Sequence, residues 1–174
     1  MGKDFVNLTF NKKASPQTVR YPFSTDYANA NLNLNKVYIL TGNQTASASE
    51  AVINGLIPYM GAENVILIGN KTEGKNVAMT SYKNEAHGIT LWPVVASVSN
   101  SNNEGDYSEG FNPHYSLNEN TLTQWHPLGN PEEYLLKNTL SLIVNGIMPD
   151  LPSSNVAETQ VIFSSIAPKG IRFE

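Results

Sequence analysis

The sequence predicts an α/β domain, and three patterns along the chain point to that class. Residues 36–42 and 65–69 are short runs of β-branched, aromatic and aliphatic residues, each closed by a glycine, which is typical of buried strands. Between them, apolar residues recur at helical spacing from Ser47 onward, and Pro58 is expected to limit this helix. A strand–helix–strand unit over 36–69 implies a parallel pair of strands joined by a right-handed crossover.

Antiparallel strands and a C-terminal helix are expected to complete this α/β architecture. Residues 77–82 and 88–99 are predicted as two strands that form an antiparallel pair. A long loop rich in Asn, Ser and Gly should occupy 100–129. A second helix then follows Asn130, because this cap residue precedes a proline and two acidic residues, and Gly146 is its expected stop.

The two ends of the chain show weaker patterns. Residues 1–35 carry short apolar patches between polar stretches, and we expect an irregular segment with one short strand there. The tail 147–174 contains Pro and Ser, with one strand-like run at 160–163. We therefore divide the chain into a folded part over 1–146 and a C-terminal tail.

Composition excludes several classes of function. A chain of 174 residues is about one domain, and 40% hydrophobic residues are enough for a core. With 11 basic and 15 acidic residues, the net charge is −4, which argues against a nucleic-acid partner. No apolar run approaches the roughly 20 residues that span a bilayer, and the polar start does not resemble a signal peptide. The absence of cysteine excludes disulfides, thiolate zinc sites and a cysteine nucleophile.

The first candidate for chemistry is Ser47, at the junction of the first strand and helix. A serine there can attack a carbonyl, while the backbone N–H of Ala48 helps to bind the resulting oxyanion. Ser47 and Glu50 also fit a capping box, in which Ser47 accepts a hydrogen bond from the helix and Glu50 reaches back. The sequence leaves both interpretations open.

The second candidate is the loop 69–76, which nearly matches a phosphate-binding P-loop. Two features argue against ATP: Asn76 replaces the Ser/Thr that should hold Mg²⁺, and a strand is predicted where the P-loop needs a helix. The loop can instead deliver Lys75 to the same rim of the sheet as Ser47, since both follow carboxyl ends of parallel strands. A lysine that loses solvent can lower its pKa from about 10.4 to near 7–8 and act as a general base for a serine.

Other polar residues carry less weight. His87, His114 and His126 lie in loop-like sequence without ligand spacing and are predicted to be surface residues, although an acid–His–Ser triad stays an alternative. The acidic loop 104–109 lacks the regular ligand spacing of a calcium site. We predict no metal and no cofactor, and the sequence leaves homo-oligomerisation open.

Together, these motifs resemble the C-terminal processing (tail-specific) serine peptidase family over residues 36–145. The resemblance implies a crotonase- and Clp-protease-like core, with Ser47 as nucleophile and Lys75 as base, and cleavage of peptide bonds near protein C-termini. The resemblance rests on residues 37–41, Thr45-Ala46-Ser47-Ala48-Ser49-Glu50, 65–69, Thr72, Gly74-Lys75 and Gly110-Phe111-Asn112-Pro113.

Three departures from the family pattern qualify this resemblance. Met79 stands where family members often have a Gln that orients the lysine, and His114 stands where Asp is usual. The family's upstream Asp-Leu-Arg-x-Asn-x-Gly-Gly segment, which supplies an oxyanion donor, and its PDZ-like domain are not found in this chain. We therefore expect the C-terminal part of a peptidase catalytic domain, inactive in isolation if the missing donor is essential. The rival is a non-catalytic binding or scaffold module in which Ser47 only caps a helix.

The resemblance also implies a partner and a location. A polypeptide is the expected substrate. The similarity is greatest to lipoprotein-like members from the envelope of gut-type bacteria, which implies a periplasmic or cell-envelope location.

Overall fold

The structure is a computed structural model and describes residues 2–13, 17–24, 26, 31–119, 122 and 125–148. Apart from 147–148, the expected tail and its strand-like run at 160–163 lie outside these residues. The described part forms nine strands and two α-helices, with two short 3₁₀ turns at Ala62–Asn64 and Glu85–His87. In chain order they are β1 (Asp4–Phe10), β2 (Thr18–Pro22), β3 (Val37–Thr41), α1 (Ala48–Met60), β4 (Val65–Gly69), β5 (Val77–Met79), β6 (Tyr82–Asn84), β7 (Ile89–Leu91), β8 (Val94–Ser99), β9 (Tyr115–Ser116) and α2 (Tyr134–Asn145).

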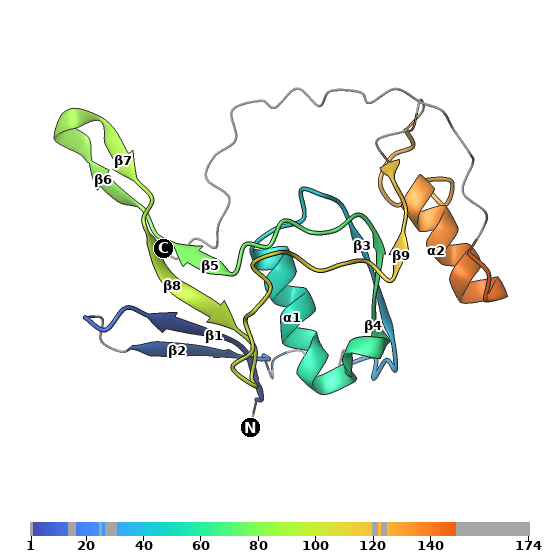
Figure 1. The fold of residues 1–174 in the computed structure, drawn as a ribbon, viewed down its shortest axis with the longest axis horizontal. Helices are drawn as coiled ribbons and strands as arrows, with labels where there is room; N and C mark the ends of the chain where they lie inside the picture. The colour runs from blue at the N-terminus through green and yellow to red at the C-terminus, as the bar shows by residue number, and fades with distance from the viewer. Residues whose placement is uncertain are drawn as a thin grey trace.

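A parallel sheet in the order β3-β4-β9 confirms the predicted strand–helix–strand unit and the α/β class. Figure 1 shows α1 on one side of β3 and β4 and α2 on the other. Successive side chains of a strand point to opposite faces, so Val65 and Leu67 pack in the cluster that includes Ile53 of α1. Ile66 and Ile68 pack on the other face in the cluster of α2. Both faces of β4 are therefore covered, which explains its unbroken apolar run.

A separate antiparallel sheet has the order β2-β1-β8-β5, and β6 pairs only with β7 in a projecting hairpin (Figure 1). The predicted antiparallel pairing of 77–82 with 88–99 is confirmed, because β5 pairs with β8 and β6 with β7. Each predicted strand is nevertheless broken in two. Pro93 separates β7 from β8, since proline cannot donate a ladder hydrogen bond.

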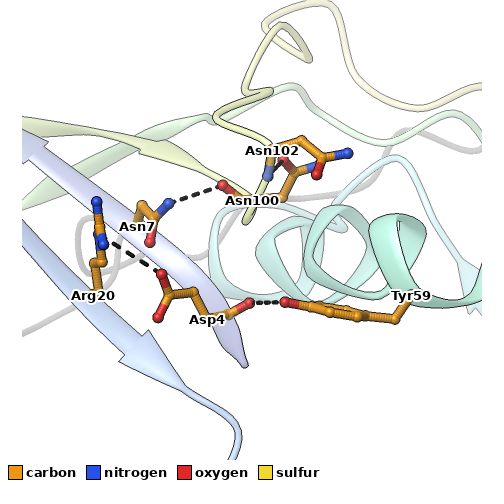
Figure 2. Close-up of polar contacts among 6 residues, drawn as sticks. All are labelled: Asp4, Asn7, Arg20, Tyr59, Asn100 and Asn102. Carbon is orange, nitrogen blue, oxygen red and sulfur yellow. Dashed lines mark hydrogen bonds and ion pairs between the residues drawn. The ribbon is translucent and has the colours of Figure 1, made fainter. Parts of the chain in front are cut away.

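The prediction of one short strand in 1–35 was wrong, because β1 and β2 both form there. β1 lies between β2 and β8 and buries three consecutive residues, so its sequence shows no alternation of apolar and polar positions. Buried Asn7 donates its side-chain amide to Asn100 O at 3.0 Å, a partner far along the chain (Figure 2). Tyr59 of α1 likewise donates its hydroxyl to Asp4 O at 2.5 Å. These non-local contacts fix β1 against α1 and β8.

The expected limit of the first helix at Pro58 was also wrong, since α1 continues to Met60. A proline inside a helix leaves the carbonyl four residues earlier without its usual donor. Here that carbonyl belongs to Asn54, and the Asn100 side chain donates to it at 3.3 Å. The helix therefore passes the proline without an unsatisfied acceptor at this position.

Two expectations in the C-terminal half need correction. The expected loop 100–129 contains β9, which is too short to leave a sequence signal and forms only by pairing with β4. The second helix begins at Tyr134 rather than after Asn130, whose side chain accepts from Glu132 N in the preceding turn. Gly146 ends the helix as predicted, with φ 68°.

In the part of the chain that the structure describes, neither α1 nor α2 is long and apolar enough to cross a membrane.

Candidate active site

Ser47 occupies a strained turn between β3 and α1. Its φ of 57° is positive, which is uncommon for a residue with a side chain, and its ψ of −111° lies outside the left-handed helical region. Such a conformation costs on the order of 1–3 kcal/mol and persists only where the surroundings enforce it. Ser47 is buried, and its Oγ has no hydrogen-bond partner among the described residues. The turn therefore holds a buried hydroxyl that makes no hydrogen bond of standard geometry among the described residues.

The carboxylate of Glu50 joins the turn that contains Ser47 to residues 70–76, the loop that carries Lys75 and is called the lysine loop below. Glu50 is fully buried in the first turn of α1. Its Oε2 accepts from the backbone N–H of Ser47 at 2.9 Å and of Lys75 at 2.7 Å. Its Oε1 accepts from Thr72 Oγ1 and from Gly74 N, each at 2.6 Å. Because the backbone nitrogens of Ser47 and Lys75 both donate to the same Glu50 oxygen, the backbones of these two residues lie close together.

Glycines allow the lysine loop to approach its neighbours closely. Gly69 ends β4 with φ 125°, and a Cβ there would lie 2.0 Å from Thr41 O. Gly74 has φ 95°, and a Cβ there would lie 2.1 Å from Ser108 O. Any side chain at either position would force the backbone apart. The loop also donates Glu73 N to Thr45 O at 2.9 Å, so it is fixed directly to the turn before Ser47.

The segment 107–111 forms a second layer behind the lysine loop. Thr72 Oγ1 accepts from Phe111 N at 2.8 Å while it donates to Glu50, and Thr72 N donates to Phe111 O at 3.1 Å. The Phe111 ring stacks on Tyr107, with ring centroids 4.9 Å apart. Burial, and secondarily the charge of Glu50, raises the pKa of the Tyr107 hydroxyl, which keeps it neutral. A neutral aromatic pair, buried Tyr107 and half-buried Phe111, therefore lies behind the Glu50 carboxylate.

The sequence-predicted site residues are brought together to different degrees. The backbones of Ser47 and Lys75 meet at Glu50, but the Lys75 amine does not hydrogen-bond to Ser47 Oγ, which has no partner among the described residues. Catalytic hydrogen bonds are often long or poorly aligned in apo structures and tighten only when substrate binds. Ala48 is exposed and is the first residue of α1, so its backbone N–H has no acceptor within the helix. The backbones of Ser47, Ala48 and Lys75 thus lie together at the carboxyl ends of β3 and β4.

The expected capping box is present in its arrangement, because Glu50 accepts from the backbone N–H of Ser47 and the Ser47 side chain faces the backbone N–H of Glu50. Ser47 Oγ nevertheless makes no hydrogen bond of standard geometry among the described residues. The hydroxyl of an ordinary N-cap would accept from the second or third helical N–H. Glu50 is therefore a structural acceptor, whereas the Ser47 side chain has the position of a capping residue without a well-formed capping hydrogen bond.

The alternative sites from the sequence have no support in the described residues. A strand, β5, follows Lys75 where a P-loop would need a helix. Among the three histidines, His114 accepts from Leu67 N through Nδ1 at 3.1 Å and His87 contacts Asn84, and none bonds to Ser47 Oγ. In the described ranges no group of three His, Cys, Asp or Glu residues could hold a metal ion.

Comparison with known proteins identifies the family. No protein-family model and no curated protein matches the sequence significantly. Among solved structures, a Bacteroides fragilis protein described as belonging to the S41 proteases aligns with 84% of this chain at 35% identity and a TM-score of 0.75. The chain belongs to the C-terminal processing peptidase family. It spans 38% of the length of that Bacteroides protein.

Two further structures resemble this peptidase-family chain. The photosystem II D1 C-terminal processing protease aligns with 71% of the chain at 20% identity and a TM-score of 0.48, covering 30% of that protein. A lipoprotein from Streptococcus agalactiae aligns with 84% of the chain at 15% identity and a TM-score of 0.54, covering 46% of that protein. The likeness to the lipoprotein concerns the fold alone, and the weaker likeness to the processing protease carries no argument.

Sequence reasoning missed the central role of Glu50 in this member of the C-terminal processing peptidases. Glu50 was interpreted only as part of a capping box, and Tyr107 was not singled out. The sequence does contain the residues involved. Glu50 belongs to the same family-like motif as Ser47, and Thr72 and Gly74 belong to the motif that ends in Lys75. The link between these two motifs is a tertiary contact, which spacing along the chain does not reveal.

Proposed function

We propose that this chain supplies the catalytic pair of a serine peptidase, with Ser47 as nucleophile and Lys75 as general base. The observation that carries the proposal is that Ser47 N and Lys75 N donate to the same oxygen of buried Glu50. The strained, unpartnered serine supports it as well, because strain that serves no packing contact is concentrated at functional sites. Membership of the peptidase family supplies the reaction class.

The proposed reaction proceeds through an acyl-enzyme. Ser47 Oγ attacks the scissile carbonyl, and the neutral amine of Lys75 takes the hydroxyl proton and then gives it to the leaving amine. Water, activated by the same amine, releases the acyl group. Since Ser47 Oγ has no partner in this structure, the active arrangement requires a change of rotamer at Ser47 or Lys75.

The negative charge of the tetrahedral intermediate is proposed to bind at the N-terminus of α1. Ala48 N–H is one donor, and the positive end of the helix dipole adds to it. A second donor is proposed to come from elsewhere in a longer native protein, as in the family. Loss of one such donor typically lowers the rate by about 10²–10³. We therefore propose residues 1–146 as the C-terminal part of the catalytic domain, with lower activity in isolation.

A fluorophosphonate probe tests the pair directly, because it reacts only with an activated serine. We expect the full-length protein to be labelled at Ser47, located by mass spectrometry of the adduct. Labelling should be lost in Ser47→Ala and in Lys75→Ala. Lys71→Ala is the matched control, because Lys71 is an exposed lysine of the same loop and should not alter labelling.

The opposite result would favour a non-catalytic binding module. Absence of labelling in a full-length protein that is shown to be folded would remove the dyad, as would full labelling of Lys75→Ala. In that case Ser47 would be only a residue of the turn, and a search for a binding partner would replace the search for a substrate.

The substrate class and location follow from the same proposal. We propose polypeptides cleaved near their C-termini as substrates and the cell envelope as the location; homo-oligomerisation stays open. Incubation of the native protein with envelope polypeptides, followed by mass spectrometry of the products, tests the first. Cleavage positions spread evenly along the substrates would argue against C-terminal processing. Fractionation of the source cells tests the location.

A further inference from the structure

The hairpin of β6 and β7 projects from the body of the molecule, and its two faces differ in chemistry (Figure 1). The antiparallel register pairs Tyr82 with Leu91, Lys83 with Thr90, and Asn84 with Ile89. Because alternate residues of a strand point to the same side, Lys83 and Thr90 share one face of the hairpin. The other four residues share the opposite face, which is called the apolar face below.

The apolar face is largely exposed. Tyr82 is 59% exposed, Ile89 53% and Leu91 62%. Within the described residues, each strand of this hairpin pairs only with the other. A two-stranded hairpin is at best marginally stable in water unless its hydrophobic face packs against further structure. The uncovered apolar face therefore indicates a contact surface.

We propose that the apolar face binds the same face of a second copy of this chain, with the two hairpins packed face to face and antiparallel. The inference does not depend on the proposed function. In a twofold contact both protomers use the same surface, so each contact occurs twice. Antiparallel packing places Tyr82 of one protomer over Asn84 of its partner. It likewise places Leu91 of one protomer over Ile89 of its partner.

The polar groups of the apolar face match this occupant. Asn84 carries the only amide of the face, and Tyr82, two residues earlier on the same strand, carries the only hydroxyl. The Asn84 side-chain oxygen lies 3.0 Å from His87 Nδ1, which leaves its NH₂ group as a donor. In the antiparallel dimer this group faces the Tyr82 hydroxyl of the partner. A second copy thus pairs both polar groups, which a purely apolar surface would leave unsatisfied.

Charge favours contact through the hairpin over contact through the body of the molecule. The chain has a net charge of −4, so two copies repel each other. In the hairpin, the charges of Lys83 and Glu85 cancel, and neither residue belongs to the apolar face. Antiparallel packing also places the two bodies at opposite ends of the paired hairpins. The contact is small, so we expect a weak dimer with a dissociation constant above about 1 μM.

Sedimentation equilibrium of the full chain over a range of concentrations tests the inference. We expect the apparent mass to rise with concentration toward that of two chains. Leu91→Glu should weaken the association by more than about tenfold, because it buries a charge without a partner. Thr90→Glu is the matched control, because Thr90 is an exposed neighbour on the opposite face, and it should dimerise like the parent.

Cross-linking supplies a second measurement that tolerates a weak contact. The chain has no cysteine, so a single introduced cysteine is the only thiol. With a short bis-maleimide, Ile89→Cys should give a covalent dimer, because position 89 lies within the contact. Thr90→Cys, on the opposite face, should give at least about tenfold less. Neither change should lower the melting temperature, since both positions are exposed.

Three results would overturn the inference. The first is a chain that stays monomeric at all concentrations, with equal cross-linking of the two cysteine variants. The second is a dimer that persists unchanged in Leu91→Glu, which would place the contact on another surface. The third is a much lower melting temperature for Leu91→Glu than for Thr90→Glu in dilute, monomeric protein, because the protein's own chain would then cover the apolar face.

Discussion

The two α-helices of this chain begin in opposite ways. At the start of α2, Glu133 has an extended backbone with φ −61° and ψ 136°, and its side chain accepts from Leu135 N and Leu136 N. At the start of α1, Ser47 is strained, and its hydroxyl accepts nothing among the described residues. Serine is the better N-cap residue by general preference, yet here the glutamate caps and the serine does not.

The difference indicates what each helix start is for. The start of α2 satisfies its own N–H groups with one relaxed side chain, which is a purely structural solution. At the start of α1, the carboxylate of Glu50 accepts from the backbone N–H groups of Ser47, Gly74 and Lys75, and the serine hydroxyl makes no hydrogen bond among the described residues. A strained helix start whose serine makes no well-formed hydrogen bond is what the proposed nucleophile would require.

The largest effect should follow replacement of Glu50 by Gln. A carboxamide keeps one acceptor oxygen, so some of the four donors at Glu50 would face an NH₂ group instead. A buried donor left unsatisfied costs about 1–3 kcal/mol, so we expect a loss of about 2–5 kcal/mol in unfolding free energy. Urea denaturation measures this loss, and fluorophosphonate labelling of Ser47 should fall with it.

The control for this change is Glu109→Gln, at an exposed position of the neighbouring loop. Surface substitutions of this kind usually stay within about 0.5 kcal/mol. Equal stability of the two variants would show that Glu50 is not the acceptor that joins the two loops.

The sequence could predict those features of the fold and of the candidate site that depend on residues close together along the chain. The strands 37–41 and 65–69, the helix after Ser47 and the stop at Gly146 follow from periodicity and from residue chemistry within a few positions. The rim shared by Ser47 and Lys75 followed from the parallel connection. The joint role of Glu50 did not, because its donors Thr72 and Gly74 are reached only through the folded loop.

Contacts between residues far apart in the sequence also explain the wrong predictions for β1, Pro58 and β9. β1 buries Asn7 because Asn100 accepts its amide, and α1 passes Pro58 because Asn100 donates to the freed Asn54 carbonyl. Neither partner is near in sequence, so local rules on polar residues and proline gave the wrong result. β9 exists only because β4 offers an edge.

The comparison of the two helix starts can be tested by removing each N-cap side chain. Glu133→Ala removes the acceptor of two N–H groups and should cost about 0.5–2 kcal/mol in unfolding free energy. Ser47→Ala removes a hydroxyl without a partner and should change the unfolding free energy by less than about 0.5 kcal/mol. Urea denaturation of both variants decides the matter. A loss for Ser47→Ala as large as for Glu133→Ala would restore the capping interpretation.

The strain at Ser47 gives a further, smaller test. Glycine adopts a positive φ without a steric penalty, whereas alanine does not. Ser47→Gly should therefore be more stable than Ser47→Ala by about 0.5–1 kcal/mol, although glycine normally lowers stability through the entropy of the unfolded chain. Parallel thermal denaturation of the two variants measures the difference. A less stable glycine variant would mean that the turn is not strained in solution.

The smallest effect is expected at Met79, the last residue of β5 and four residues after Lys75. Family members often have Gln there, and a Gln amide can hold the lysine amine where methionine offers only a weak acceptor. A hydrogen bond contributes about 0.5–1.5 kcal/mol net, so Met79→Gln should raise the rate of Ser47 labelling by about two- to tenfold. Met79→Leu, which offers no acceptor, is the control. If both variants are labelled at the same rate as the parent protein, other groups orient the Lys75 amine, and residue 79 has no effect on the reactivity of Ser47.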